Sequence, residues 1–303
     1  METFPQHHAS WKGTTGGTTW MQRMLVVCLG WMNLPLVYSG MACIIPFYML
    51  FNHQGYISQY HFFRERMKYG KFKSFFSVYL NHFCFGQVIL DRFAVYGGAS
   101  FKVKIDGEET YHRYLAQQEG FVQLSSHVGN FELAGYMLTQ DKKPISALVF
   151  QGETSTVMKN RARIFQNKHI RLISVGNDLA HVFAMNTAIK EGGIVSMPGD
   201  RNLGSQKSVA CQFFGSKAHF PMGPFALAVT TGIPVLSIFV MKESIYQYRV
   251  YVNEVKLPLE VNGMTAKKKI ELLAQEFAAQ LEQRVRQYPY QWFNYYEFWN
   301  NQI

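Results

Sequence analysis

The stretch Phe121-Val-Gln-Leu-Ser-Ser-His127-Val-Gly-Asn-Phe-Glu132 carries an apolar run into a polar turn that contains a histidine and a carboxylate. An imidazole can take a proton from a hydroxyl or an amine near neutral pH, and a nearby carboxylate can fix its tautomer. On one regular helix the two side chains would lie about 140° apart. We therefore expect His127 to lie before a helix and Glu132 to lie in its first turn.

The residues around His127 predict a strand that turns into a helix. Ser125 or Ser126 would end the strand, and Gly129 would permit the bend. Asn130 would cap a helix that runs over 131–138. Neighbouring side chains of a strand point to opposite faces, and the sequence has no Gly-x-Ser-x-Gly elbow, so a serine hydrolase with Ser126 as nucleophile is disfavoured.

Three further blocks follow in order along the chain. They are Gly193-Ile-Val-Ser-Met-Pro-Gly-Asp200-Arg201, Phe213-Phe-Gly-Ser-Lys-Ala-His-Phe-Pro221-Met-Gly-Pro-Phe-Ala-Leu-Ala228 and Tyr288-Pro-Tyr-Gln-Trp-Phe293. Together with His127-x4-Glu132, these blocks resemble the lipid A late acyltransferases, a branch of the lysophospholipid acyltransferase superfamily. The phenylalanines and tryptophans of the blocks receive no functional role by themselves, because such side chains are more often part of a core.

The resemblance implies an enzyme that moves a fatty acyl group from an acyl-carrier-protein or coenzyme A thioester to a hydroxyl, or an amine, of a lipid or saccharolipid. His127 would be the general base and Glu132 the carboxylate that orients it. No cofactor is expected beyond the thioester, which is a co-substrate. The rival interpretation is a non-catalytic lipid-binding or assembly protein with the same fold, and the presence of both residues argues against it.

Several positions depart from the family pattern. Arg201 stands where glutamine is usual, Tyr290 stands where glutamate is common, and 294–297 lack the favoured histidine and arginine. The acceptor therefore stays open between lipid A, a lysophospholipid, an aminolipid and a polyene pigment precursor.

Four residues are candidates for contact with substrate. Asp200 and Arg201 would lie at the carboxyl end of a strand, where α/β sheets bind ligands. Arg201 could contact a phosphate or carbonyl oxygen, although a surface salt bridge explains each residue equally well. Arg161, with Arg163 beside it, is a weaker phosphate candidate, because a solvated helix face explains it better. Asn130, in the same turn as His127, completes the set.

Composition favours anionic partners. The 303 residues carry a formal net charge of +10, which suits nucleic acid, anionic lipid or an acidic carrier protein. No zinc-finger spacing or RNA-binding aromatic box supports nucleic acid. Five basic residues instead follow an apolar segment closely and favour a membrane surface: Arg64, Arg66, Lys68, Lys71 and Lys73. The four cysteines, Cys28, Cys43, Cys84 and Cys211, form no metal spacing, so neither zinc nor a disulfide framework is expected.

We expect a flexible tail over 1–19, an apolar and basic helical membrane-associating region over 20–95, and an acyltransferase α/β domain over 96–303. The apolar run 24–51 exceeds the ~20 residues that a bilayer span needs. Pro35 and Pro46 interrupt it, which favours an embedded or interfacial hairpin or one kinked span, with a buried helix pair as the alternative. The resemblance places the protein at a bacterial inner membrane, with its catalytic domain facing the cytoplasm.

The pattern of the remaining chain predicts a mixed, largely parallel central sheet flanked by helices, because strands alternate with helices. Besides the strand before His127, strands are predicted at 101–105, 144–150, 170–175, 194–197, 234–241 and 246–252, with the last two antiparallel. Helices are predicted at 60–94, 108–119, 155–167, 179–190, 224–231 and 265–287.

Overall fold

The fold is taken from a computed structural model, which describes residues 20, 24, 27, 29, 33–51, 53–138, 143–150, 170–175, 180–201, 207–260 and 263–299. The predicted tail over 1–19, the predicted helix over 155–167, and Cys28, Arg161 and Arg163 lie outside these residues.

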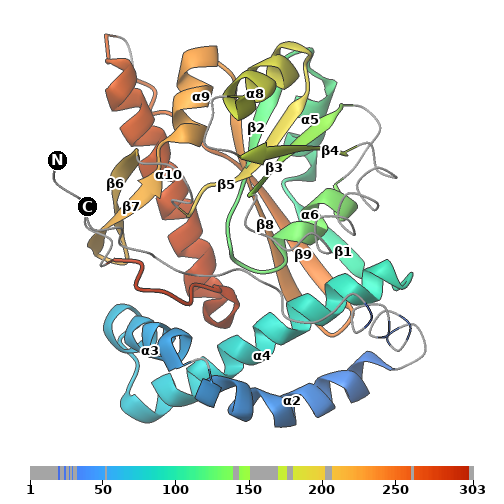
Figure 1. The fold of residues 1–303 in the computed structure, drawn as a ribbon. Helices are drawn as coiled ribbons and strands as arrows, with labels where there is room; N and C mark the ends of the chain where they lie inside the picture. Colours follow the sequence, from blue (N-terminus) through green and yellow to red (C-terminus); the bar gives the residue numbers. More distant parts are fainter. Residues whose placement is uncertain are drawn as a thin grey trace, which may run out of the picture.

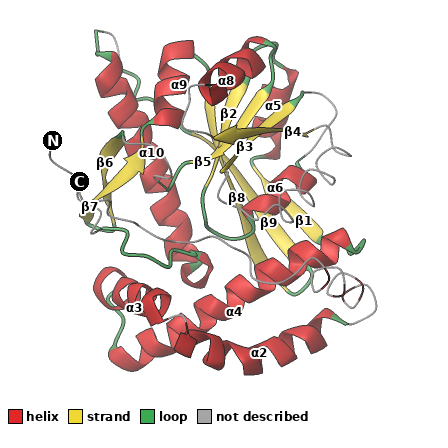
Figure 2. Ribbon diagram, viewed as in Figure 1, coloured by secondary structure: helices red, strands yellow, loops and turns green. Residues whose placement is uncertain are grey.

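A seven-stranded sheet forms the centre of the molecule, in the order β1-β9-β8-β2-β5-β3-β4 (Figure 2). Its strands are β1 (Lys102–Asp106), β2 (Phe121–Ser125), β3 (Ile145–Phe150), β4 (Ile170–Val175), β5 (Ile194–Pro198), β8 (Val235–Ser244) and β9 (Gln247–Glu254). All neighbouring strands are parallel except β8 and β9, which pair antiparallel. The predicted mixed, largely parallel sheet is confirmed, as is its antiparallel pair.

Helices cover both faces of the sheet, since successive side chains of β8 enter two different cores. Phe239 and Met241 join the core that contains α8 (Ala180–Lys190), α9 (Gly223–Thr231) and α10 (Ala266–Gln287). Ile238 and Val240 join the core that contains α5 (Glu108–Ala116) and α6 (Phe131–Met137). This two-sided burial explains why the central strands are apolar without alternation. The helix predicted over 108–119 is shorter in the structure, where it ends at Ala116.

The helix α10 follows its sequence pattern closely. The hydroxyl of its N-cap, Thr265, accepts a hydrogen bond from the backbone N of Lys268 at 3.3 Å. Its apolar stripe is buried against the sheet, with Phe277 and Leu281 fully enclosed.

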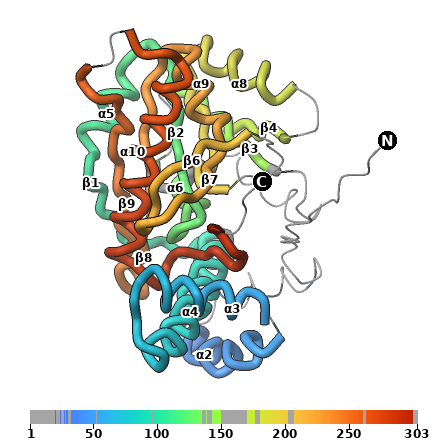
Figure 3. Tube along the Cα trace, turned by 90° about the vertical axis from the view of Figure 1, so that its left-hand side faces the viewer, coloured from blue at the N-terminus to red at the C-terminus, as the bar shows by residue number. Residues whose placement is uncertain are grey.

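A second group of helices lies across one end of the sheet, below it in Figure 1 and again in the turned view of Figure 3. It consists of α2 (Leu34–Phe51), α3 (His53–His61), the π-helical turn η1 (Phe62–Arg66) and α4 (Lys71–Tyr96). The single helix predicted over 60–94 is wrong, because the chain breaks between η1 and α4, where Lys68 adopts a left-handed φ of 58°. Among the described residues α2 alone is long and apolar enough to cross a membrane, and it contains Pro46.

A two-stranded hairpin, β6 (Ser208–Phe213) and β7 (Ser216–Pro221), was not predicted. The signal was present, since β6 alternates exposed and buried side chains along its length. Phe214 and Gly215 form its two-residue turn with φ of 51° and 71°, as a type I′ hairpin requires. Gly215 suits this geometry, and Phe214 adopts it while its ring packs against Phe213 and Phe62.

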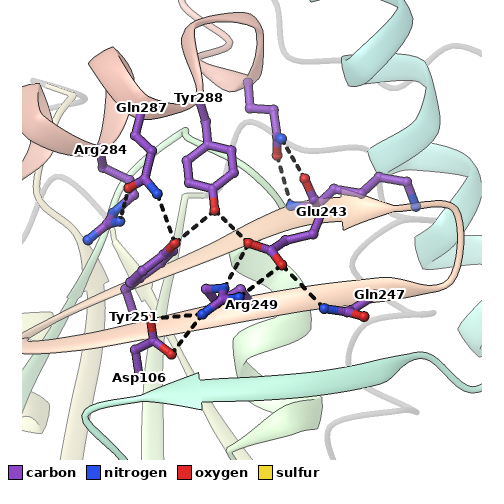
Figure 4. A network of polar contacts seen from close by, with 10 residues as sticks. Asp106, Glu243, Gln247, Arg249, Tyr251, Arg284, Gln287 and Tyr288 are labelled. Carbon is purple, nitrogen blue, oxygen red and sulfur yellow. Dashed lines mark hydrogen bonds and ion pairs between the residues drawn. The ribbon is translucent and has the colours of Figure 1, made fainter.

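A polar network fastens the end of α10 to the edge of the sheet (Figure 4). The hydroxyl of Tyr288 donates to Glu243 Oε1 at 2.8 Å and lies 2.8 Å from the hydroxyl of Tyr251. Arg249 Nε donates to the same Glu243 oxygen at 2.7 Å, and its Nη1 donates to Asp106. The hydrogen bond from Arg249 lowers the pKa of Glu243 and keeps it ionised. The network fixes where the chain leaves α10 for the C-terminal segment.

Candidate active site

The turn that carries His127 follows β2, a fully buried strand between β5 and β8. The C-terminal segment runs antiparallel beside this turn. Gly129 N donates to Gln291 O at 2.7 Å, and Phe293 N donates to His127 O at 2.9 Å. An isolated bridge between Val128 and Trp292 lies between these two bonds. The block around Gln291 therefore acts as an extra strand that holds the backbone of His127.

The other side of the turn rests on β8. Asn130 N donates to Val240 O at 2.7 Å. Gly129 has a φ of +60°, and a Cβ atom at this position would lie 2.1 Å from the same carbonyl oxygen. Only glycine fits both this backbone conformation and this close approach. The predicted role of Gly129 in the bend is confirmed, and the bend is fixed from two sides.

Asp200 lies directly against His127. Its Oδ1 is 2.9 Å from Nδ1 of the imidazole, and its Oδ2 accepts a hydrogen bond from the backbone N of His127 at 2.8 Å. The pairing follows from the sheet, because β2 and β5 are parallel neighbours with Ser125 opposite Pro198. Both strands end near these positions, at the same end of the sheet. The side chains of His127 and Asp200, which follow the two strands, therefore meet there. The side chain of Asp200 is 2% exposed and the side chain of His127 is 15% exposed.

The carboxylate that contacts Nδ1 of His127 belongs to Asp200, whereas the family resemblance predicts Glu132 in the orienting role. Glu132 lies in the first turn of α6, as expected, and its Oε1 is 2.6 Å from Nη1 of Arg92 on α4. No hydrogen bond or ion pair joins His127 and Glu132, both of which lie in the described part of the chain. The carboxylate turns to Arg92 because α4 passes beside the start of α6. A part for Glu132 in the reaction stays a prediction.

The electrostatics of the site favour a neutral imidazole. Burial lowers the pKa of His127, and the charge of Arg201 lowers it further. The carboxylates of Asp200 and Glu132 act in the opposite direction without restoring the ordinary value. Burial would raise the pKa of Asp200, but His127 and Arg201 outweigh it, so that the pKa falls and the carboxylate stays ionised.

With Nδ1 facing a carboxylate, the neutral ring carries its proton on Nδ1. Nε2 then presents a lone pair. No described residue forms a hydrogen bond with Nε2, and the ring of Phe131 lies edge-on to the imidazole at 5.1 Å. Such a ring can accept a proton from a hydroxyl or amine that reaches it.

Arg201 lies inside the molecule, 7% exposed, so the alternative of a surface salt bridge is wrong for it and for Asp200. Its Nη2 donates to Phe293 O at 2.6 Å, and its guanidinium lies 5.8 Å from the ring centre of Tyr296. Burial lowers the pKa of Arg201, while Asp200 opposes the shift. The side chain thus joins the site to the C-terminal segment, and contact with substrate stays a prediction for both residues.

Asn130 caps α6 by position, as predicted, but its side chain makes no capping hydrogen bond. Its Nδ2 donates instead to Val88 O on α4 at 3.3 Å and to the hydroxyl of Tyr248 on β9 at 3.2 Å. Contact of Asn130 with substrate remains a prediction.

Gln291 and Trp292 support the site from beneath, a role that the sequence alone does not predict. The side chain of Gln291 pairs with both backbone groups of Lys242 on β8, at 2.9 and 2.8 Å. Trp292 is 1% exposed and packs against Phe62 and Phe213. The aromatic blocks are core, as expected. The only sequence signal that these blocks belong to one site was that they occur in the same order as in the family.

The fold and this site define an α/β enzyme with a histidine and an aspartate at the carboxyl ends of two neighbouring parallel strands. Residues 98–300 match the family model of the bacterial lipid A biosynthesis acyltransferases. The chain therefore belongs to this family and is an acyltransferase, as the resemblance implied.

Among curated proteins none matches the sequence. Among solved structures, the chain is similar to the crystal structure of the 1-acyl-sn-glycerophosphate acyltransferase of Thermotoga maritima. The identity is 13% and the TM-score is 0.37, over 89% of this chain and 98% of that one.

Proposed function

We propose that this protein transfers a fatty acyl group from an acyl-carrier-protein or coenzyme A thioester to a hydroxyl or amine of a lipid or saccharolipid acceptor, with His127 as general base. The observation that carries the proposal is the contact between His127 Nδ1 and Asp200 at 2.9 Å. It directs the basic lone pair of a neutral imidazole away from the carboxylate. Membership of the lipid A acyltransferase family supplies the class of reaction.

The reaction needs no covalent enzyme intermediate, because a thioester is already activated. Nε2 of His127 removes the proton of the acceptor as its oxygen or nitrogen attacks the thioester carbonyl. Asp200 stabilises the imidazolium that forms. The tetrahedral intermediate then expels the thiolate, which takes the proton from Nε2, so that the enzyme returns to its starting state. A positioned base contributes about 10² to 10⁴ in rate.

Glu132 enters this scheme through its charge. It acts on His127 to raise the pKa of the imidazole, in the same direction as Asp200. Because it is also ion-paired with Arg92, it fixes the first turn of α6 with respect to α4. We propose that Glu132 adjusts the pKa of His127 without contacting it, while Asp200 holds the imidazole directly.

The acceptor is proposed to be anionic. Arg201 brings a buried positive charge close enough to His127 to lower its pKa, and the whole chain carries a net charge of +10. A phosphate on the acceptor would gain from such a charge in a region of low dielectric constant. An acidic carrier protein would gain from the net charge during its approach.

We further propose that α2 and the start of α4 seat the enzyme on the inner membrane, from its cytoplasmic side. Large apolar side chains are exposed on both helices, among them Phe51 at 88% and Phe72 at 85%. An exposed apolar surface of this kind next to lysines suits the boundary between acyl chains and headgroups. A lipid acceptor could then reach the site without leaving the bilayer.

The experiment that tests the function is mass spectrometry of the total lipids of cells with and without the gene. We expect one lipid class to gain the mass of a fatty acid less one water when the gene is present. The mass difference identifies the acceptor and the chain length together. A set of lipids that is identical in both strains, together with binding of lipid by the purified protein, would favour the non-catalytic alternative.

A further inference from the structure

We propose that Tyr248 is a positioning residue for the turn 126–130, which carries His127 and is called the catalytic turn below. Tyr248 holds this turn through Asn130, and its own hydroxyl is held by the buried carboxylate of Asp91. This inference rests on the proposed role of His127 as general base. The hydrogen bonds of Tyr248 and Asp91 do not involve His127, so Tyr248 would act on the rate through the geometry of the turn.

The hydrogen bonds of Tyr248 run in one direction. Its hydroxyl donates to Oδ2 of Asp91, because a carboxylate can only accept. The one proton of the hydroxyl is thereby used, so its oxygen must accept the bond from Asn130 Nδ2 at 3.2 Å. The second Asn130 proton goes to Val88 O. The orientation of the Asn130 amide is therefore fully determined by its neighbours.

Burial keeps this chain of bonds in its protonation state. Asp91 is fully buried, and burial raises the pKa of Tyr248 well above its ordinary value, with the charge of Asp91 adding to the shift. Tyr248 is itself 0% exposed. The phenol of Tyr248 thus keeps the proton that it donates to Asp91.

Lys242 supplies the charge that makes a buried Asp91 tolerable. Its Nζ lies 2.5 Å from Asp91 Oδ2, and the pair is almost wholly enclosed, at 7% and 0% exposure. Lys242 is also the residue whose backbone is clamped by the Gln291 side chain. Gln291 in turn accepts the hydrogen bond from Gly129. The two supports of the catalytic turn, one through Asn130 and one through Gln291, therefore meet at Lys242.

Three residues in about one turn of α4 bind the residues of the catalytic turn or their supports. Val88 accepts the bond from Asn130, Asp91 holds Tyr248, and Arg92 pairs with Glu132. The helix α4 also belongs to the group that lies across the end of the sheet (Figure 1). The place of His127 in the site thus depends on how α4 is docked. A displacement of about 1 Å in a catalytic group can lower the rate by up to ~10²-fold.

A matched control for Tyr248 exists, because Asp91 accepts hydrogen bonds from two phenols. The second phenol belongs to Tyr38 on α2. The Tyr38 hydroxyl reaches Oδ1 of Asp91, whereas Tyr248 reaches Oδ2 and continues to Asn130. Both phenols are buried, and phenylalanine would remove the same hydroxyl from the same carboxylate. Only one of the two substitutions breaks the connection to the catalytic turn.

The experiment compares Tyr248→Phe and Tyr38→Phe in the full-length protein. The wild type is first tested with acyl-carrier-protein and coenzyme A thioesters over a range of chain lengths and with phosphorylated and dephosphorylated lipids, and the fastest pair is then used throughout. We expect Tyr248→Phe to lower kcat by about tenfold with little change in KM, because the base is displaced while the binding surfaces remain. We expect Tyr38→Phe to keep kcat within about twofold, with a similar loss of thermal stability.

A double-mutant cycle with Asn130→Ala makes the test independent of stability. If Asn130 and Tyr248 act as one chain, the double variant should lose no more kcat than the more severe single variant. Should Tyr248→Phe fail to fold, Asn130→Ala must still show a fall in kcat, and an unchanged kcat in that variant would overturn the inference. Unchanged kcat in Tyr248→Phe, an equal fall in Tyr38→Phe, or losses that multiply in the cycle would each overturn the inference.

His127→Ala in the same assay separates this inference from the proposed function. Activity that survives in His127→Ala contradicts the base assignment, whatever Tyr248 does. A dead His127→Ala beside a fully active Tyr248→Phe removes only the positioning role.

Discussion

Asp200 holds His127 by two bonds at once, since its Oδ1 faces the imidazole Nδ1 at 2.9 Å while its Oδ2 accepts from the backbone N of the same residue at 2.8 Å. A carboxylate attached to both the ring and the backbone limits the rotation of the side chain as well as its tautomer. The parallel pairing of β2 with β5 creates this arrangement. The base is thereby preorganised before substrate arrives.

Replacing Asp200 with asparagine should lower kcat by about 10² to 10⁴, because asparagine has one acceptor oxygen where Asp200 serves two N–H groups of His127, and it lacks the charge that stabilises the imidazolium. The negative charge of Asp200 raises the pKa of His127, so its removal should also move the acid limb of the kcat/KM profile to lower pH. Steady-state rates measured across the pH range test both effects. Asp106→Asn, at an exposed carboxylate of the Figure 4 network, is the control and should keep kcat. A fully active Asp200→Asn would contradict the account.

Arg201→Gln should move the same acid limb in the opposite direction. The guanidinium lowers the pKa of His127, and without it the imidazole should become protonated at higher pH. The limb should therefore appear at higher pH than in the wild type. If the acceptor is anionic, affinity should also fall for the phosphorylated lipid and stay unchanged for its dephosphorylated form. An acid limb that stays in place or moves to lower pH would exclude the assigned electrostatic role.

Glu132→Ala should lose most of the turnover. The substitution removes a charge that raises the pKa of His127 and breaks the ion pair between Glu132 and Arg92. Glu132→Gln, which keeps the shape, should shift the acid limb to lower pH by less than Asp200→Asn does. Arg92→Met separates the two effects, because it breaks the ion pair and keeps the carboxylate. Equal losses in Arg92→Met and Glu132→Ala would mean that Glu132 acts only through the ion pair.

Gly129→Ala should lower the free energy of unfolding by about 1 to 3 kcal/mol, since alanine at a φ of +60° is strained. The new Cβ would also press on the carbonyl oxygen of Val240, so the turn should shift and activity should fall with stability. Urea unfolding and turnover measure the two effects. Gly223→Ala is the control, because its Cβ would meet no atom within 4 Å. Equal stability of the two variants would contradict the described turn.

Membrane attachment can be tested by washing membranes with alkaline carbonate. If α2 is embedded in the bilayer, the protein should stay with the membranes, and complete release would rule out a spanning helix. Phe72→Ser combined with Phe76→Ser should weaken attachment, because both side chains are exposed at the start of α4. Phe183→Ser removes a phenylalanine that is 70% exposed on α8, on another part of the molecule, and should change nothing. Equal effects of both changes would contradict a specific membrane face.

Much of the fold was predictable because its strands and helices carry strong periodic signals. The strand over 170–175 and the helix over 265–287 match the structure, and the turn after β2 lies where Gly129 placed it. The break after η1 was not predicted, since residues on both sides of it are aromatic and basic and continue one helical pattern. The hairpin β6–β7 was overlooked because its turn contains a phenylalanine at positive φ.

The site was predictable in its members and less so in their pairing. His127, Glu132, Asp200 and Arg201 were all named, and the sheet brings His127 and Asp200 into contact. Spacing along the chain favoured Glu132 as the partner of the base. The order of strands decides which side chain lies beside the imidazole, and the sequence does not state that β2 and β5 are neighbours. Tyr248 and Gln291 were missed for the same reason, because their roles depend on contacts between distant segments.

The most direct measurement is acyl transfer by purified wild-type protein and His127→Ala, followed by mass spectrometry of the lipid product. Circular dichroism and thermal unfolding should show the same fold for both proteins. The account predicts that the wild type adds one acyl group to a lipid acceptor, and that His127→Ala forms product at least about 10²-fold more slowly. Transfer at the wild-type rate by a folded His127→Ala would contradict the central claim.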